Sequence, residues 1–159
     1  MKKNYVSNSE ESIQLFENKF LNSLYKVHFT VPLFIFIPVI SYLIYLAFSQ
    51  GLGLLVFGGL FVSGIFVWTL TEYVVHRFVF HFHPTSNFGK RIHFIFHGVH
   101  HDYPRDKKRL VMPPSASIPL ATFFFFLFKL LLPAPGLFGF FAGFLLGYLI
   151  YDMMHYAMH

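Results

Sequence analysis

The chain has 159 residues, of which 55% are hydrophobic and 12% are charged, with a formal net charge of +5. A soluble domain averages about 25% charged residues, so this composition indicates a protein whose solvent is lipid. The chain has no cysteine, which excludes disulfides, thiolate ligands and Fe–S clusters and leaves only nitrogen and oxygen to hold a metal. The length suits one domain spanning residues 1–159. Residues 1–26 are charged and amphipathic, which excludes a signal peptide.

Residues 8–27 are predicted to form a helix within an N-terminal interfacial segment, residues 1–28. Asn8 can cap this helix at its start. Its apolar residues recur at helical spacing: Ile13, Phe16, Phe20, Leu21 and Leu24. Such a helix lies on a membrane rather than across it, although the same pattern fits a helix packed on protein.

Four apolar runs follow, and they predict an all-α integral membrane protein with four transmembrane helices. The runs are residues 29–48, 52–75, 115–132 and 136–159. The first has 20 uncharged residues, which at about 1.5 Å per residue span a hydrocarbon core of roughly 30 Å. The second could continue to His81. Its glycines, Gly58, Gly59 and Gly64, permit close contacts between helices.

Basic residues predict the orientation of these helices. Four precede the first run and seven lie between Arg77 and Arg109, whereas the turns at 49–51 and 133–135 carry none. The positive-inside rule then places the N-terminus and residues 82–114 in the cytoplasm. With four spans, the histidines near the C-terminus return to that same side.

Histidines gather in two segments, residues 72–101 and the C-terminus, and their spacing suits metal binding. His97, His100 and His101 stand at i, i+3 and i+4, so a helix would place them on one face. His155 and His159 are four apart. His76 and His81 are five apart, about 140° around a straight helix. They can share a site only if the helix ends or bulges between them, or if they bind different metals.

A neutral imidazole is a common metal ligand, and five or more of them exceed what one tetrahedral metal needs. The pattern therefore predicts two metals. Glu72 lies one turn before His76 and Asp152 three residues before His155, where each could accept the second N–H of a ligating imidazole. The alternative for both carboxylates is a residue at headgroup level that reaches water. His93 and His83 are weaker ligand candidates, and His28 is predicted to be structural.

Four segments, EYVVHRFVFH, FHGVHH, RLVMPP and YDMMHYAMH, resemble the fatty acid hydroxylases of the sterol desaturase superfamily, most closely its fatty acid 2-hydroxylases. The resemblance covers residues 55–159. It implies a membrane anchor of four helices capped by a cytoplasmic, histidine-rich dimetal site. Active members use iron and O2 to replace C–H by C–OH beside the carbonyl of a free or sphingolipid-linked acyl chain. The ligands that the resemblance implies are His76, His81, His97, His100, His101, His155 and His159.

The sequence leaves alternatives open for the identity of the metal and for the reaction. Nitrogen ligands accept Fe, Cu, Ni or Zn, and the affinity order favours zinc over iron. Because hydroxylation of an unactivated C–H bond needs a redox metal, we expect two iron ions and O2 in function, and zinc could occupy a purified sample. No catalytic residue beyond the ligands is predicted. The alternatives are a sterol or carotenoid hydroxylase or desaturase, or a non-enzymatic metal-binding membrane protein. The uncharged centres of all four runs argue against a transporter.

Residues 105–114 could receive the headgroup or carboxylate of a lipid substrate. The candidates are Arg105, Lys107, Lys108 and Arg109, and the alternative is an ordinary basic loop. The expected partners are membrane lipids, not nucleic acid. There is no room for the cytochrome b5 domain of many eukaryotic members, so a separate cytochrome b5-like or ferredoxin-like donor is expected. The family pattern continues past His159 with three further ligands. A chain ending there is expected to bind fewer than two metals and to be inactive.

Overall fold

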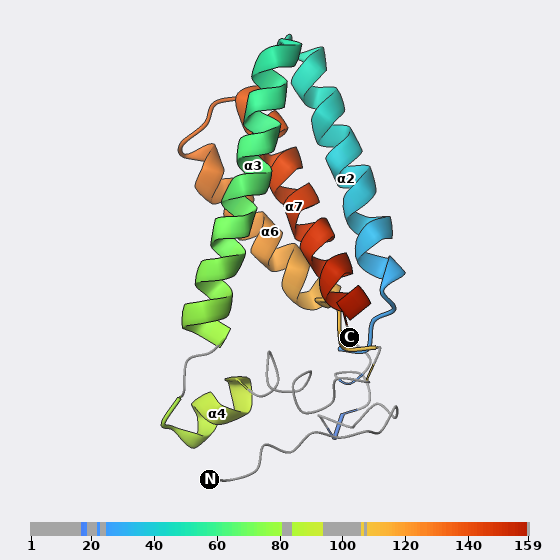
Figure 1. The fold of residues 1–159 in the computed structure, drawn as a ribbon, viewed down its shortest axis with the longest axis vertical. Coiled ribbons are helices and arrows are strands. Elements are labelled where there is room, and N and C mark those ends of the chain that lie inside the picture. Colours follow the sequence, from blue (N-terminus) through green and yellow to red (C-terminus); the bar gives the residue numbers. More distant parts are fainter. Residues whose placement is uncertain are drawn as a thin grey trace.

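The computed structural model describes residues 25–80, 84–93 and 108–158, together with residues 17, 18, 22 and 106. This part of the chain contains helices and no strand, which confirms the all-α prediction. The elements are α2 (Thr30–Ser49), α3 (Leu54–Val74), the π-helical segment η1 (Val75–Phe80), α4 (Asn87–His93), α6 (Pro114–Lys129) and α7 (Gly136–Met158) (Figure 1). Of the predicted interfacial helix at 8–27, only residues 17, 18, 22 and 25–27 are described, and residues 25–27 are not helical.

Each of the four apolar runs forms a helix, and three of these helices are long and apolar enough to cross a membrane. They are α2, α3 with its continuation to Phe78, and α7. The fourth, α6, has 16 residues and ends at Lys129, so it is about 24 Å long. It begins at Pro114, whose ring suits the first turn of a helix, and the chain turns at Leu130 and Leu131 before Pro133.

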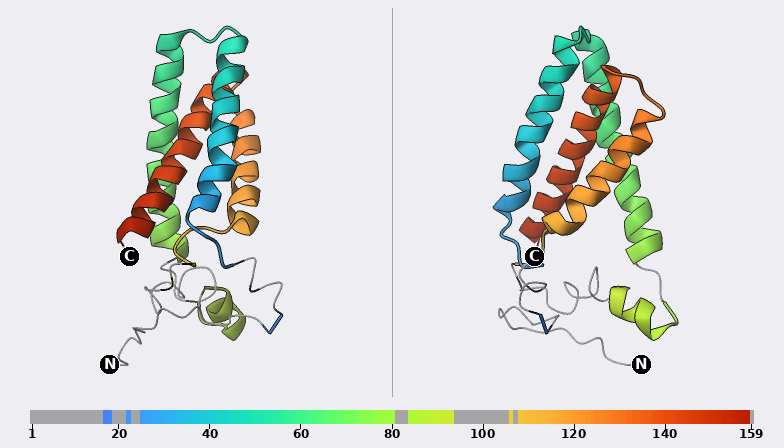
Figure 2. Two further views of the ribbon diagram at one scale, coloured as in Figure 1. Left: turned by 90° about the vertical axis from the view of Figure 1, so that its right-hand side faces the viewer. Right: turned by 180° about the vertical axis from the view of Figure 1, so that it is seen from behind.

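Helix α7 forms the centre of the bundle, and α2, α3 and α6 all pack on it (Figure 2). It is buried around most of its circumference, whereas outward positions of α2 and α3 are open; Leu55, for example, is 91% exposed. Aromatic rings fill the contacts with α7: Phe36 meets Tyr148 edge-on at 5.1 Å, and Phe128 meets Phe144 at 5.0 Å. An apolar exterior of this extent suits contact with lipid rather than with water.

Helices α3 and α7 touch through their backbones, because glycines remove the side chains between them. A Cβ on Gly143 would overlap the carbonyl oxygen of Phe61, and one on Gly64 would overlap that of Phe140. Of the three glycines noted in the second apolar run, only Gly64 serves this contact. Gly58 and Gly59 face open space. Small residues at such positions let membrane helices approach closely.

Candidate metal centre

Helices α3 and α7 run parallel and end at the same end of the bundle (Figure 1). Side chains of the two helices are paired at successive helical turns toward that end. Trp68 of α3 packs on Gly147 of α7. Four residues later in both helices, the Tyr151 hydroxyl lies near the carboxylate of Glu72. Four residues later again, the numbering reaches His76 and His155. The register that the glycines establish thus leads two predicted ligands to the same end of the bundle.

The α-helical geometry of α3 changes at the first of the predicted ligands. Segment η1 is a π-helix that contains His76 and ends at Phe80, one residue before His81. Because a π-helix forms hydrogen bonds between residues i and i+5, residues five apart lie near each other on its surface. Such π turns inside α-helices are frequent at functional sites. The sequence required an end or a bulge here if His76 and His81 were to share a metal, and η1 is such a change. His81 itself lies outside the described residues.

Glu72 is a buried carboxylate, 9% exposed, beside the first predicted ligand. Its Oε1 atom lies 3.7 Å from Nδ1 of His76. When Nδ1 of an imidazole faces a carboxylate, the lone pair of Nε2 on the other side of the ring is free to bind a metal. Ligating histidines usually adopt this arrangement. The proximity agrees with the partner role predicted for Glu72, although that role depends on a bound metal and stays a prediction.

Tyr151 links both helices at this site, and the sequence analysis did not identify it. Its hydroxyl lies near Glu72 on α3, while its ring stacks on the His155 ring with centroids 6.0 Å apart and planes at 21°. One side chain therefore orients the partner of His76 and the plane of His155 together. The spacing of four between Tyr151 and His155 was a usable signal, because it places both rings on one helix face.

Asp152 makes a different set of contacts from those its position suggested. It is buried, and its Oδ1 atom accepts the backbone N–H of Met112 at 3.1 Å. Its Oδ2 atom accepts the Tyr148 hydroxyl at 3.3 Å. These bonds tie the segment before α6 to α7, so Asp152 has a clear structural role. Its predicted role as a partner of His155 stays a prediction.

The headgroup candidates also differ from one another. Arg109 has a side chain only 4% exposed, and its Nε atom lies 3.1 Å from Oδ2 of Asp106, whose side chain is 2% exposed. Burial lowers the pKa of Arg109 from its usual value, and the Asp106 charge opposes that shift. A lipid headgroup would have to compete with Asp106 for this guanidinium. Lys108 is exposed, while Arg105 and Lys107 lie outside the described residues.

The remaining predicted ligands are not among the described residues: His81, His97, His100, His101 and His159. In the part of the chain that the structure covers, no group of three or more potential ligands could hold a metal ion. Two of the predicted ligands, His76 and His155, are described, and they supply imidazole nitrogens of the kind that suit Fe or Zn. His28 lies 2.9 Å from the Thr30 hydroxyl at the start of α2, with its Nδ1 as the bonding atom.

Comparison with known proteins identifies the family. The family model described as fatty acid hydroxylase matches residues 61–159, more than half of the chain. The chain belongs to the fatty acid hydroxylase family. This confirms the resemblance that the histidine motifs indicate.

Family members of known name align with most of the chain. Rat fatty acid 2-hydroxylase is 38% identical over 92% of this chain and 45% of its own length. The dihydroceramide fatty acyl 2-hydroxylase FAH1 of Arabidopsis thaliana is 39% identical over 95% of this chain and 64% of its own. The ceramide very long chain fatty acid hydroxylase SCS7 of Saccharomyces cerevisiae is 42% identical over 93% and 39%, respectively. The chain spans about half the length of the curated relatives it matches.

A solved structure shares the fold. The structure described as full-length scs7p, in which only the hydroxylase domain is visible, superimposes with a TM-score of 0.84 at 42% identity. The match covers 91% of this chain and 55% of that one. Since the identity is well above the range in which only folds agree, the arrangement of helices and the residues they carry are comparable in the two proteins.

Proposed function

We propose that this protein is a membrane-bound, O2-dependent hydroxylase that acts on a lipid acyl chain, at C2 of a free or sphingolipid-linked fatty acid. The observation that carries the proposal is the proximity of His76 to the buried Glu72, with Tyr151 between Glu72 and the ring of His155. Membership of the fatty acid hydroxylase family supports the reaction. The names of the rat, plant and yeast relatives support the substrate class and the position.

The predicted ligands would hold two iron ions, with His76 and His155 contributed by the described helices. The metal, when bound, would supply the O2 chemistry that replaces a C–H bond by C–OH, which side chains alone cannot supply. The residues of the protein hold and orient the predicted metal ligands. The buried Glu72 keeps the Nδ1 side of His76 occupied, and the Tyr151 ring stacks on the His155 ring and holds its plane.

In this proposal α6 is the fourth transmembrane helix and the histidines form a cap on the cytoplasmic side. Although α6 has 16 residues, the apolar residues Leu130, Leu131 and Leu132 extend its run toward the far surface. The basic residues support the cytoplasmic placement, because they gather at the end of the bundle that carries the histidines. Electrons would come from a separate donor protein.

Single-cysteine labelling should verify this topology, because the chain has no cysteine of its own. We expect Ser86→Cys to react with a membrane-impermeant maleimide from the cytoplasmic side, and Ser49→Cys and Ala134→Cys only from the opposite side. The reason is that the two short turns lie at the end of the bundle away from η1 (Figure 1). If Ser86→Cys and Ala134→Cys react from the same side, α6 does not cross the membrane and the four-helix topology is wrong.

Lipid analysis tests the reaction itself. Cells without a fatty acid 2-hydroxylase of their own should accumulate 2-hydroxylated fatty acids in their sphingolipids when they express this protein in a version extended through a second H-x2-HH motif. Liquid chromatography and mass spectrometry measure these lipids. Growth under 18O2 should place the heavy isotope in the new hydroxyl group. Hydroxylated or desaturated sterols or carotenoids, with unchanged acyl chains, would instead favour the alternative substrate class.

A further inference from the structure

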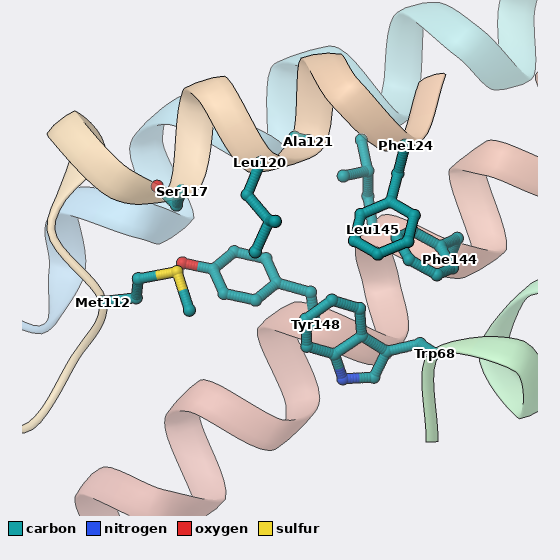
Figure 3. A pocket seen from close by; sticks show the side chains of 9 residues that line it. All are labelled: Trp68, Met112, Ser117, Leu120, Ala121, Phe124, Phe144, Leu145 and Tyr148. Atoms are coloured by element: carbon teal, nitrogen blue, oxygen red, sulfur yellow. The ribbon is translucent and has the colours of Figure 1, made fainter. Parts of the chain in front are cut away.

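An apolar crevice lies between α3 and α6, with α7 as its floor (Figure 3). Helices α3 and α6 both pack on α7 but make little direct contact with each other. The crevice has an unfilled volume of about 250 Å³ if the part open to the surroundings is included. The crevice is lined by Trp68, Met112, Ser117, Leu120, Ala121, Phe124, Phe144, Leu145 and Tyr148.

The position of the crevice connects it with the candidate metal centre. Trp68 lies one helical turn before Glu72, and Tyr148 lies one turn before Asp152. Moving along the wall from Phe124 and Phe144 toward Trp68 and Tyr148 therefore leads from the middle of the bundle to the end that carries His76 and His155. An extended apolar molecule in the crevice would have one end beside that centre and the other among membrane-facing residues.

The wall also carries two buried polar atoms without a hydrogen-bond partner among the described residues, Nε1 of Trp68 and Oγ of Ser117. Trp68 is buried, and its Nε1 atom has no hydrogen-bond partner among the residues that the structure describes. A buried donor without an acceptor costs about 1–3 kcal/mol. An oxygen atom on a bound molecule could satisfy this donor at the end of the crevice nearest to Glu72.

We propose that this crevice seats the acyl chain of the substrate lipid, with the tail along α7 between α3 and α6 and the carbonyl end toward Glu72 and His76. The hydrocarbon around the crevice indicates which kind of molecule occupies it. A crevice open to hydrocarbon fills with hydrocarbon, because an empty apolar space forfeits dispersion contacts on all its walls. Because the unfilled space includes a part open to the surroundings, the chain lies along the open side. This inference rests on the proposed function, because it assigns the substrate's place in that reaction.

Photo-crosslinking in membranes tests the seat directly. The probe is a long-chain fatty acid with a diazirine near the methyl end and an alkyne handle, incorporated into vesicles of phosphatidylcholine that contain the unmodified protein. We expect the crosslinks to concentrate on Leu120, Phe124 and Phe144, and excess unlabelled ceramide to compete with them. Crosslinks spread over lipid-facing residues such as Phe34 and Phe66, without competition, would overturn the proposal.

Filling the crevice provides the second test. Ala121→Phe places a ring in the crevice, whereas Thr122→Phe adds the same ring to an exposed position of the same helix. Crosslinking in the crevice should fall about tenfold in Ala121→Phe, as expected when roughly two methylene groups lose their burial. It should not change in Thr122→Phe, and the fluorescence of Trp68 reports whether each variant is folded. Equal crosslinking in a folded Ala121→Phe would refute the seat.

The two proposals can fail separately. Hydroxylated lipid from the unmodified protein without competed crosslinks in the crevice would leave the proposed function standing and remove the seat. Competed crosslinks in the crevice without any hydroxylated lipid would keep the seat as a lipid-binding site and remove the proposed function.

Discussion

In a version extended through a second H-x2-HH motif, replacing His76 or His155 by alanine should abolish lipid hydroxylation and lower the metal content of the purified protein. Metal ligands take part in the chemistry, so partial activity is not expected. His76 lies beside Glu72 at 3.7 Å, and His155 stacks on Tyr151 at 6.0 Å. The measurements are 2-hydroxylated sphingolipids in expressing cells and metal per chain by mass spectrometry. The same loss is expected for His97→Ala and His101→Ala.

Two variants serve as controls for these replacements. His28→Ala should keep its activity, because His28 bonds Thr30 at the start of α2, away from the predicted ligands in sequence. Tyr151→Phe keeps the ring on His155 but removes the hydroxyl that lies near Glu72. Its metal affinity should fall about 10–100-fold, the usual effect of removing an outer partner of a ligand. Full hydroxylase activity in His76→Ala would show that His76 is not a ligand.

Gly143→Ala should destabilise the bundle by about 1–3 kcal/mol, the range of overpacking in a well-packed interior. The added methyl group would overlap the backbone carbonyl of Phe61, which cannot rotate away as a side chain can. Helices α3 and α7 would therefore have to move apart along much of their contact. A larger replacement, Gly143→Leu, should prevent folding.

The matched control is Gly59→Ala, because a Cβ at Gly59 meets nothing within 4 Å. It should unfold like the unmodified protein when titrated with denaturing detergent. The chain has one tryptophan, and Trp68 packs on Gly147 in the same interface, so its fluorescence reports this contact directly. Equal stability of the Gly143→Ala and Gly59→Ala proteins would show that the close contact is absent.

The helices were predictable because the membrane dictates their length and composition. The apolar runs located α2, α3 and α7 to within about two residues at most ends, since a bilayer requires long uncharged segments. The extent of α6 was less predictable. Its C-terminal residues are as apolar as the rest of the run, yet the chain turns at Leu130 before Pro133.

The partners of individual side chains were harder to predict, because they depend on which helix faces which. Gly58, Gly59 and Gly64 look alike in sequence, but only Gly64 faces α7. The bond from Asp152 to Met112 joins residues forty positions apart, and no local pattern signals it. Arg109 looked like an exposed cation in a basic loop, whereas the acid that pairs with it, Asp106, stands only three residues earlier.

The backbone contact at Gly64 and Gly143 also bears on how the protein responds to its lipid environment. Bilayers differ in thickness, and membrane helices adapt by tilting or by changing their packing. Two helices held apart by flexible side chains can slide to follow such changes, but α3 and α7 have no side chain between them at these glycines. His76 and His155 each lie twelve residues beyond one of these glycines, about 18 Å along the helix. The relative position of the two histidines is therefore insulated from bilayer thickness, and α2 and α6 are the helices left to adapt.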